Sequence, residues 1–307
     1  MKKLALAFDT SNYTTSCAVY DGETGDNSGR LLDVRPGELG LRQSDALFSH
    51  VKRLPEIVRK IALENGEIIA VGASEKPRET EDSYMPCFLA GVSQAKVMAD
   101  VLHVPYFGFS HQQGHIAAAA WSAGHMELLA VEHLAWHLSG GTTELLYVRP
   151  EGVAVRCEII GGTSDVSAGQ LIDRAGQVLG LQFPAGKALD KLSKNAEKKL
   201  FYTPKADGMR FSLSGVEHKM HQMAEAEEKP EEIAYFAITS MIKAVHQATE
   251  VATKKYGNIP ILYSGGVASN SLLREMTPGG IFAEPKYSTD NAMGTAILTM
   301  RAVQEIE

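Results

Sequence analysis

The sequence has no long hydrophobic run and little cysteine. Its start, "MKKLALAFD", holds only five apolar residues between Lys3 and Asp9, too short for the apolar core of a secretory signal, and no stretch approaches the roughly 20 residues of a membrane span. The three cysteines are far apart and never form a Cys-x-x-Cys pair, so neither a disulfide framework nor a thiolate zinc site is predicted. We therefore expect a cytoplasmic protein without a membrane partner.

Positive charge is also scarce. The 307 residues include 30 Lys and Arg against 37 Asp and Glu, which gives a net charge of −7. Affinity for a nucleic-acid backbone comes from Lys and Arg that displace counterions, so this balance argues against a protein that grips nucleic acid with its whole surface. An RNA substrate would need a local basic patch or a basic partner.

Two similar hairpins indicate an internal duplication. Residues 4–25 read as a strand, a polar turn with a Thr pair, a second strand and a Gly-containing turn, and residues 132–152 repeat this layout. Hydrophobic residues make up 44% of the chain, enough for one large core or two moderate ones. Because later strands alternate with helices in both halves, we predict a duplicated α/β architecture of two lobes with a cleft between them.

Local patterns predict the main helices. Apolar residues at steps of three and four favour helices over 44–65 and 88–102. A long helix is expected over about 232–255, and a final helix from near Asp290 to the end of the chain. The charged intervals 74–86 and 224–232 are interpreted as solvated connections.

Histidine is concentrated in one part of the chain. Six of the ten histidines fall between His103 and His137, and two of them, His111 and His115, are four residues apart in "HQQGH". On a helix this spacing places two imidazoles on one face, where they could share a metal, although ordinary polar surface explains such a pair equally well. Gln112 stands where the metalloprotease motif has its general-base Glu, so protease chemistry lacks its base.

Two Ser-Gly-Gly segments suggest a nucleotide. They occupy 139–141 and 264–266, each after an apolar strand. There, glycine lets backbone N–H groups approach a phosphate or an adenine ring, whereas a tight turn is the simpler explanation for a single pair. Asp173 on an expected helix and Gly186 in a proline-marked loop add a ribose acceptor and a backbone contact.

Seven motifs, in order, resemble one family. They are "DTS", "GFSHQQGH", "LSGGTTELL", "LIDRAGQVLGLQFPAGKALDKL", "FSLSGVEHKM", "YSGGVASNSLLREM" and "STDNAM". The chain is similar to the family that installs threonylcarbamoyl on the adenosine next to the tRNA anticodon, formerly described as O-sialoglycoprotein endopeptidases. The resemblance implies the two-lobed actin-like ATPase fold of actin, sugar kinases and Hsp70, with duplicated ribonuclease H-like domains. We expect lobes at 1–125 and 126–289, with the helix at 290–307 packed back on the first.

The same resemblance implies a metal site. The family's ligands match His111, His115 and Asp290, and His137 stands where some members have a Tyr ligand. A set of nitrogen and oxygen ligands without sulfur suits Zn²⁺, Fe²⁺ or Mn²⁺ and does not choose among them.

The implied donor is threonylcarbamoyl-adenylate, with ATP as a related nucleotide. The metal and the amides of 139–141 would face the phosphate and carbamoyl oxygens, and no residue is identifiable as a general base. The remaining nucleotide and cleft candidates are, in chain order, Asp9, Ser11, His137, Leu138, Ser139, Gly140, Gly141, Asp173, Gly186, Asp190, Gly265, Gly266 and Asn270. The implied macromolecular partners are tRNA and other proteins of a tRNA-modification complex.

Three departures from the family pattern leave other functions open. The charged segment 74–86 replaces a Gly-Pro-Gly segment, Gln113 replaces a usual Glu, and Thr142 replaces a His or Asn. The chain could therefore be a divergent paralogue: a carbamoyltransferase that uses another acceptor, or a catalytically silent scaffold. An ATP-dependent kinase of the same fold is a further alternative, in which the histidines would have no purpose.

Overall fold

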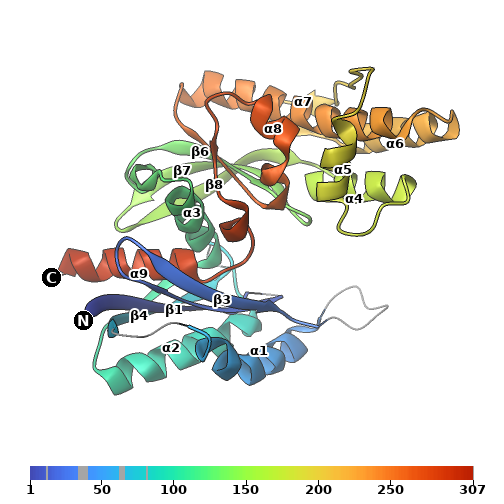
Figure 1. Ribbon diagram of the computed structural model, residues 1–307. Helices are drawn as coiled ribbons and strands as arrows, with labels where there is room; N and C mark the ends of the chain where they lie inside the picture. Colours follow the sequence, from blue (N-terminus) through green and yellow to red (C-terminus); the bar gives the residue numbers. More distant parts are fainter. Residues whose placement is uncertain (12, 34–40, 62–65, 81, 307) are drawn as a thin grey trace. The chain divides into compact units, whose positions relative to one another are not determined.

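The computed structural model describes residues 1–11, 13–33, 41–61, 66–80 and 82–306 (Figure 1). Contacts divide the chain into two compact units. The first contains Met1–Val131, Arg149–Cys157 and Thr289–Glu307, and the second contains Glu132–Val148 and Glu158–Ser288. Each unit has its own sheet and its own hydrophobic core.

The first unit is built on a five-stranded sheet of order β3-β2-β1-β4-β5. The bounds are β1 (Lys2–Asp9), β2 (Thr14–Tyr20), β3 (Gly25–Leu31), β4 (Gly66–Lys76) and β5 (Tyr106–Ser110). β1, β2 and β3 pair antiparallel, whereas β4 and β5 join parallel to β1 and to each other. α1 (Gln43–Val58) and α2 (Leu89–Leu102) cover one face of this sheet, and α9 (Met293–Ile306) covers the other, beside α3 (His111–Ser122) (Figure 1).

The second unit holds a seven-stranded sheet of order β12-β11-β6-β7-β8-β10-β9. The bounds of its strands are β6 (His133–Leu138), β7 (Thr143–Glu151), β8 (Ala154–Thr163), β9 (Ala206–Asp207), β10 (Arg210–Phe211), β11 (Ile261–Ser264) and β12 (Ile281–Phe282). Its helices are α4 (Ala168–Val178), α5 (Gly186–Ser193), α6 (Ser214–Glu225), α7 (Pro230–Tyr256) and α8 (Ser271–Glu275). Short 3₁₀ turns lie at Pro86–Phe88, Met126–Ala130, Gly266–Ser269 and Pro285–Tyr287.

The duplicated hairpin is present in both sheets. β1 pairs antiparallel with β2, and β6 pairs antiparallel with β7. In each unit the first strand of the hairpin then receives a parallel neighbour, β4 beside β1 and β11 beside β6. Strands β1 and β2 are almost wholly buried, as expected for strands covered on both faces.

The sequence predicted the wrong end residues for some of the elements. Residues 74–76, placed in a charged loop, form the end of β4, because the strand continues along β5 as far as Lys76. The final helix begins at Met293, so Asp290 lies in the loop before it. The helix expected over 44–65 ends at Val58. Its last expected residues, 62–65, and Glu81 of the expected loop lie outside the described residues.

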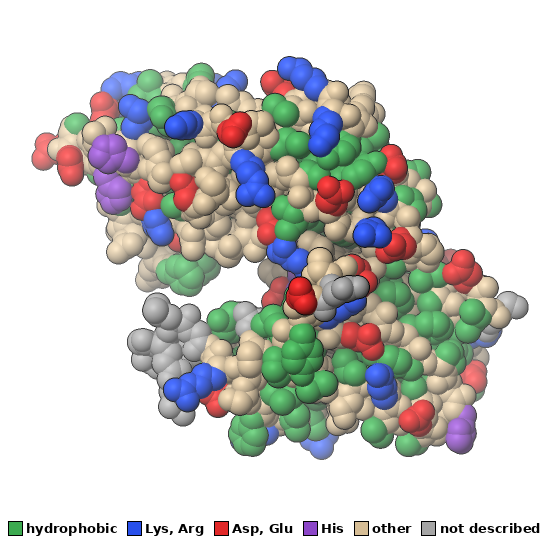
Figure 2. Space-filling view, turned by 180° about the vertical axis from the view of Figure 1, so that it is seen from behind, with side chains coloured by type: hydrophobic (Ala, Val, Ile, Leu, Met, Phe, Trp, Pro, Cys, Tyr) green, Lys and Arg blue, Asp and Glu red, His purple; other side chains and the backbone are tan. Residues whose placement is uncertain are grey.

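Charge of both signs is present on the face of the molecule seen in Figure 2. Figure 2 shows one face, on which acidic and basic side chains are interspersed. In the described parts of the chain, no helix is both long enough and apolar enough to cross a membrane.

Candidate functional site

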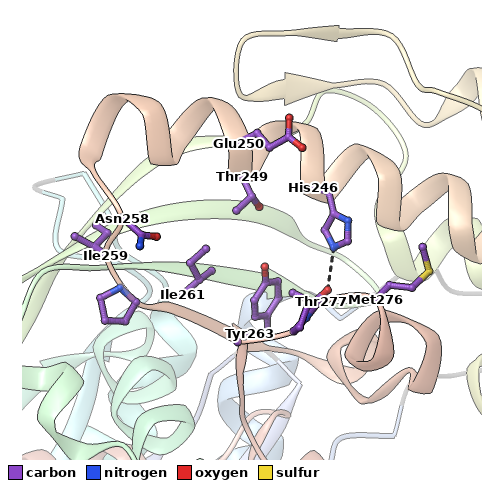
Figure 3. A pocket seen from close by; sticks show the side chains of 13 residues that line it. His246, Thr249, Glu250, Asn258, Ile259, Ile261, Tyr263, Met276 and Thr277 are labelled. Atoms are coloured by element: carbon purple, nitrogen blue, oxygen red, sulfur yellow. Dashed lines mark hydrogen bonds between the residues drawn. The ribbon is translucent and has the colours of Figure 1, made fainter.

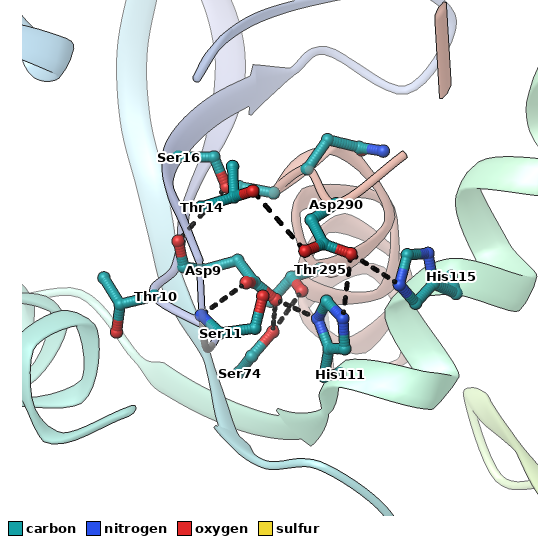
Figure 4. A network of polar contacts seen from close by, with 12 residues as sticks. Asp9, Thr10, Ser11, Thr14, Ser16, Ser74, His111, His115, Asp290 and Thr295 are labelled. Carbon is teal, nitrogen blue, oxygen red and sulfur yellow. Dashed lines mark hydrogen bonds and ion pairs between the residues drawn. The ribbon is translucent and has the colours of Figure 1, made fainter. Parts of the chain in front are cut away.

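His111, His115 and Asp290 meet in the first unit (Figure 4). One oxygen of Asp290 lies 3.5 Å from His111 Nε2 and 3.3 Å from His115 Nε2. The three ligand atoms are all within 4.8 Å of one another. Metal–ligand bonds of about 2.0–2.2 Å in a tetrahedron place neighbouring ligand atoms about 3.4 Å apart. The donor set therefore fits one small divalent cation.

The start of α3 positions both imidazoles. Ser110 ends β5 and caps α3: its hydroxyl accepts a hydrogen bond from Gln113 N–H, while the Gln113 side chain accepts one from Ser110 N–H. His111 is the first residue of the helix, and His115 follows one turn later on the same face. The capping box thus fixes the residue at which α3 begins, and with it the helical face on which both histidines lie.

Gln113 also explains one departure from the family pattern. Its amide nitrogen donates to the Val155 carbonyl at 2.9 Å, in addition to the cap that its oxygen forms. Ionised Glu has no donor and could make only the cap. An amide at this position therefore connects the start of α3 to the segment Arg149–Cys157, which belongs to the same unit.

A close crossing of α3 and α9 brings Asp290 to the histidines. A Cβ atom on Gly294 would lie 1.7 Å from the Gly114 carbonyl oxygen, so only glycine allows this approach. Asp290 precedes α9 by three residues, and its second oxygen accepts a 3.4 Å hydrogen bond from Thr14 Oγ1. The packing of α9 on α3 thus fixes the position of Asp290, the proposed ligand that is distant in sequence.

Asp9 supports the candidate metal site through its contact with His111. Its buried carboxylate lies 2.7 Å from His111 Nδ1 and also accepts hydrogen bonds from Ser74 Oγ and from Ser11 N–H (Figure 4). Burial by itself would raise the pKa of Asp9, but the charge and hydrogen bonds of His111, Ser74 and Ser11 hold it below its ordinary value. An ionised carboxylate can only accept, so Nδ1 carries the hydrogen and Nε2 is left to face Asp290.

Carboxylates shift the protonation of the centre. Burial would lower the pKa of His111, but Asp9 and Asp290 outweigh it and raise that pKa to about 10. The pKa of Asp290 is lowered, because hydrogen bonds and charge from both histidines exceed the effect of its burial. Without a metal, His111 is therefore protonated at neutral pH. Its positive charge then occupies the position that a bound cation would take.

The second unit contains the predicted nucleotide residues. A cavity of about 600 Å³ is lined by Gly140, Gln170, Asp173, Arg174, Gln177, Gly180, Leu181, Phe183 and Ala185. Asp173 Oδ1 accepts a 2.9 Å hydrogen bond from Ala185 N–H, which holds the loop before α5 against α4. Ser167 Oγ donates to the Gly140 carbonyl, so the cap of α4 also fixes the glycine turn.

Other predicted nucleotide residues already have structural partners. Asp190 accepts hydrogen bonds from the Ser271 hydroxyl at 2.8 Å and from its N–H at 3.2 Å, and Asn270 caps α8 by accepting from Leu273 N–H. Gly265 has φ +90°, and a Cβ there would lie 2.2 Å from the Leu138 carbonyl oxygen, so the chain needs glycine at this point. A Cβ on Gly141 or Gly266 would meet nothing within 4 Å. Gly186 begins α5.

His137 lies in the second unit, on β6, where its Nδ1 is 3.4 Å from Ser264 Oγ. Its ligation of the metal stays a prediction. Ser139 closes the turn after β6: its N–H donates to the Thr142 carbonyl at 2.8 Å, and its hydroxyl accepts from Thr142 N–H at 3.0 Å. Thr142 is thus a turn residue, which gives one departure from the family pattern a structural role.

A second cavity, of about 560 Å³, was not anticipated from the sequence (Figure 3). It lies beside α7 and β11 in the second unit, and His246, Glu250 and Tyr263 are among its lining residues. His246 Nε2 is hydrogen-bonded to Thr277 Oγ1 at 2.9 Å, and Thr249 accepts from Trp136 Nε1 at 2.9 Å. His246 and Thr249 thus form hydrogen bonds within the protein, and we assign this cavity no function.

Sequence similarity now identifies the family. Residues 49–297 match the family described as tRNA N6-adenosine threonylcarbamoyltransferase. The chain belongs to this family. A relative of that name from Lacticaseibacillus casei (strain BL23) is 32% identical over 296 residues, which cover 89% of this chain and 82% of the relative. Another, from Halalkalibacterium halodurans, is 31% identical over 316 residues, with 95% and 88% covered.

Solved structures confirm the actin-like α/β fold of this transferase-family chain. Full-length HypF in a phosphate- and nucleotide-bound form has a TM-score of 0.62 at 13% identity, with 98% of this chain and 56% of that chain covered. A ROK family protein from Streptococcus pneumoniae TIGR4, in complex with sucrose, has a TM-score of 0.52 at 12% identity, with 99% of both chains covered. At these identities the likeness concerns the fold alone.

Sequence reasoning missed three polar residues around the candidate metal site of this family member: Ser74, Thr295 and Thr14. Ser74 was placed in a solvated loop, yet its hydroxyl lies between Asp9 and Thr295 Oγ1. Thr14 contacts Asp290, although it was considered only as part of a hairpin turn. An available signal was the small polar residue at the end of the apolar run in β4, next to the strand that ends in Asp9.

Proposed function

We propose that the chain transfers the threonylcarbamoyl group from threonylcarbamoyl-adenylate to the adenosine next to the tRNA anticodon, with a divalent metal held by His111, His115 and Asp290. The observation that carries the proposal is the meeting of two imidazole nitrogens and a carboxylate oxygen in a member of this family. The metal, when bound, supplies positive charge for the oxygens of the donor. His137 is a fourth ligand in this proposal.

The chain's own residues orient the reactants. The cavity beside Gly140 takes the adenosine of the donor, with Asp173 close to its ribose and the amides of 139–141 near its phosphate. Asp9 holds His111 in the tautomer that presents Nε2. Ser74 and Ser11 hold Asp9 in turn.

The chemistry is acyl transfer to nitrogen. The N6 amine of adenosine attacks the carbamoyl carbon, the new C–N bond forms, and the C–O bond to phosphate breaks. AMP leaves with the bonding electrons, and the amine proton passes to solvent or to the leaving phosphate. Fixed amide donors stabilise the negative charge that grows on the phosphate without reorganising at the moment of reaction. We assign no general base.

The test follows labelled threonylcarbamoyl from the adenylate to tRNA, with the protein alone and with cell extract that supplies protein partners. His111→Ala should reduce transfer about 100- to 1,000-fold, the range for loss of one charge-stabilising group. His125→Ala is the matched control, because His125 is exposed and pairs with Glu127 away from the centre. Equal transfer by wild type and His111→Ala would refute the metal's role, and label that reaches only a small acceptor would refute the tRNA assignment.

A further inference from the structure

Three lysines form a stripe on α5. Lys187, Lys191 and Lys194 follow at steps of four and three, in and directly after this helix, and all three are exposed. Side chains at this spacing lie on one face of a helix. The other face is buried through Leu189 and Ser193. The stripe is therefore a fixed row of positive charge on an acidic protein.

These charges are not neutralised by near neighbours. Within the part of the chain that the structure describes, none of the three lysines is in an ion pair, whereas nearby Lys198 pairs with Glu228 at 3.1 Å. The acid of the same helix, Asp190, has its Oδ1 engaged by the hydroxyl and N–H of Ser271. The stripe can therefore interact with an anionic partner without first breaking an ion pair.

The segment that follows the stripe is firmly held. The buried Glu232 carboxylate accepts hydrogen bonds from Glu197 N–H at 3.0 Å and Lys198 N–H at 2.9 Å. Further along, Tyr202 N–H donates to Ser240 Oγ at 2.8 Å. These contacts attach residues 197–202 to α7. A surface with rigid support loses little conformational entropy when it binds a partner.

An exposed aromatic ring stands four residues before the stripe. Phe183 is 83% exposed, and it lines the cavity that also contains Gly140 and Asp173. Four residues of chain span at most about 14 Å, so Phe183 lies near Lys187. A row of cations beside an exposed aromatic ring is a combination that suits unpaired nucleic acid, because phosphates pair with the cations and a base stacks on the ring.

We propose that Phe183 and the lysine stripe of Lys187, Lys191 and Lys194 form the surface on which the RNA acceptor docks. Phosphates of a single-stranded loop lie along the stripe, and an unpaired base stacks on Phe183 at the mouth of the cavity. The inference rests on the proposed function, for which it names the RNA-contacting residues. It also resolves how a chain of net charge −7 can hold RNA, because a local stripe supplies the cations.

The first test replaces all three stripe lysines with Gln and measures binding of an anticodon stem-loop RNA at several salt concentrations, without donor. Three lost phosphate contacts should reduce the slope of log K against log salt by about 2, at roughly 0.7 per contact with single-stranded RNA. Lys243, Lys254 and Lys255, which are exposed on α7, are replaced with Gln as the matched control. This control has the same change of net charge and should keep the wild-type slope.

The second test places 2-aminopurine at the acceptor position of the same RNA. Stacking on Phe183 should quench its fluorescence, Phe183→Ala should remove the quenching and weaken binding about 5- to 150-fold, and Phe183→Tyr should retain both. An unchanged salt slope in the lysine variant, no salt-dependent binding by wild type, or unchanged quenching in Phe183→Ala would overturn the proposal. Because binding is measured without transfer, an inactive wild type that still binds RNA through the stripe would refute only the proposed function.

Discussion

At the scale of single residues, the proposed metal centre depends on the residues that surround its ligands. Asp9, Ser11 and Ser74 do not reach the proposed cation, yet they decide how His111 is held. The pKa of His111, raised to about 10, means that a metal must displace a proton at neutral pH. Metal affinity should accordingly rise with pH.

Asp9→Asn tests this arrangement. The variant keeps the size of the side chain but loses the charge that orients His111, so we expect affinity for Zn²⁺ or Mn²⁺ to fall about 10- to 100-fold. Because the pKa of His111 also falls, affinity should depend less on pH than in wild type. Competition with a chromophoric chelator between pH 6 and pH 9 measures both effects. Equal affinity and an equal pH slope in the two proteins would show that Asp9 does not support the centre.

At the scale of secondary-structure elements, α3 provides both histidines of the site. Substitutions in its first turn should therefore affect the site most. The helix is capped by Ser110 and Gln113, and Gln113 also donates to Val155. Its crossing with α9 leaves no room for a side chain on Gly294. Substitutions at this end of α3 should therefore change the positions of the proposed metal ligands.

Gln113→Glu isolates one of these contacts. The Glu side chain can keep the cap but leaves the buried Val155 carbonyl without its donor, which costs about 1–3 kcal/mol of unfolding free energy. Chemical denaturation measures this loss. Gln112→Glu is the matched control, because residue 112 is less buried and lies outside the capping box, so its unfolding free energy should change by less than about 0.5 kcal/mol. A Gln113→Glu protein as stable as wild type would contradict this account.

At the scale of the whole molecule, the two units have separate cores and each contains one of the two tryptophans. Trp121 belongs to the first unit, and Trp136 is fully buried in the core of the second. Three of the four proposed metal ligands, His111, His115 and Asp290, belong to the first unit, whereas His137 belongs to the second. The first unit thus holds most of the proposed metal ligands, and the second holds the cavity proposed for the nucleotide.

This division predicts where metal stabilises the chain. In Trp136→Phe the fluorescence reports the first unit, and in Trp121→Phe it reports the second. Saturation at about 100 times Kd stabilises the state that binds by about 2.7 kcal/mol. We expect Zn²⁺ or Mn²⁺ to raise the thermal transition reported by Trp121 by more than that reported by Trp136, because the first unit holds three of the four proposed ligands. Equal shifts of both transitions would contradict this expectation and show that the two units unfold together.

The sequence by itself determined the local features of the site. The spacing of His111 and His115 places them on one helical face, and the glycine pairs at 139–141 and 264–266 follow strands, as the structure has them. The helix α2 also follows from apolar periodicity. These features depend on residues within a few positions of one another, and backbone geometry repeats over that range.

Only the tertiary structure decided which distant residues support the histidines. The family resemblance supplied Asp290, but its approach depends on the glycine contact between α3 and α9, and Ser74 joins the network because β4 lies beside β1. Such contacts depend on how elements pack, and no local periodicity records the packing partner of a residue. Gln113 is a further example. The sequence showed only that it departs from the family pattern, whereas the structure shows that its amide donates a hydrogen bond to the Val155 carbonyl.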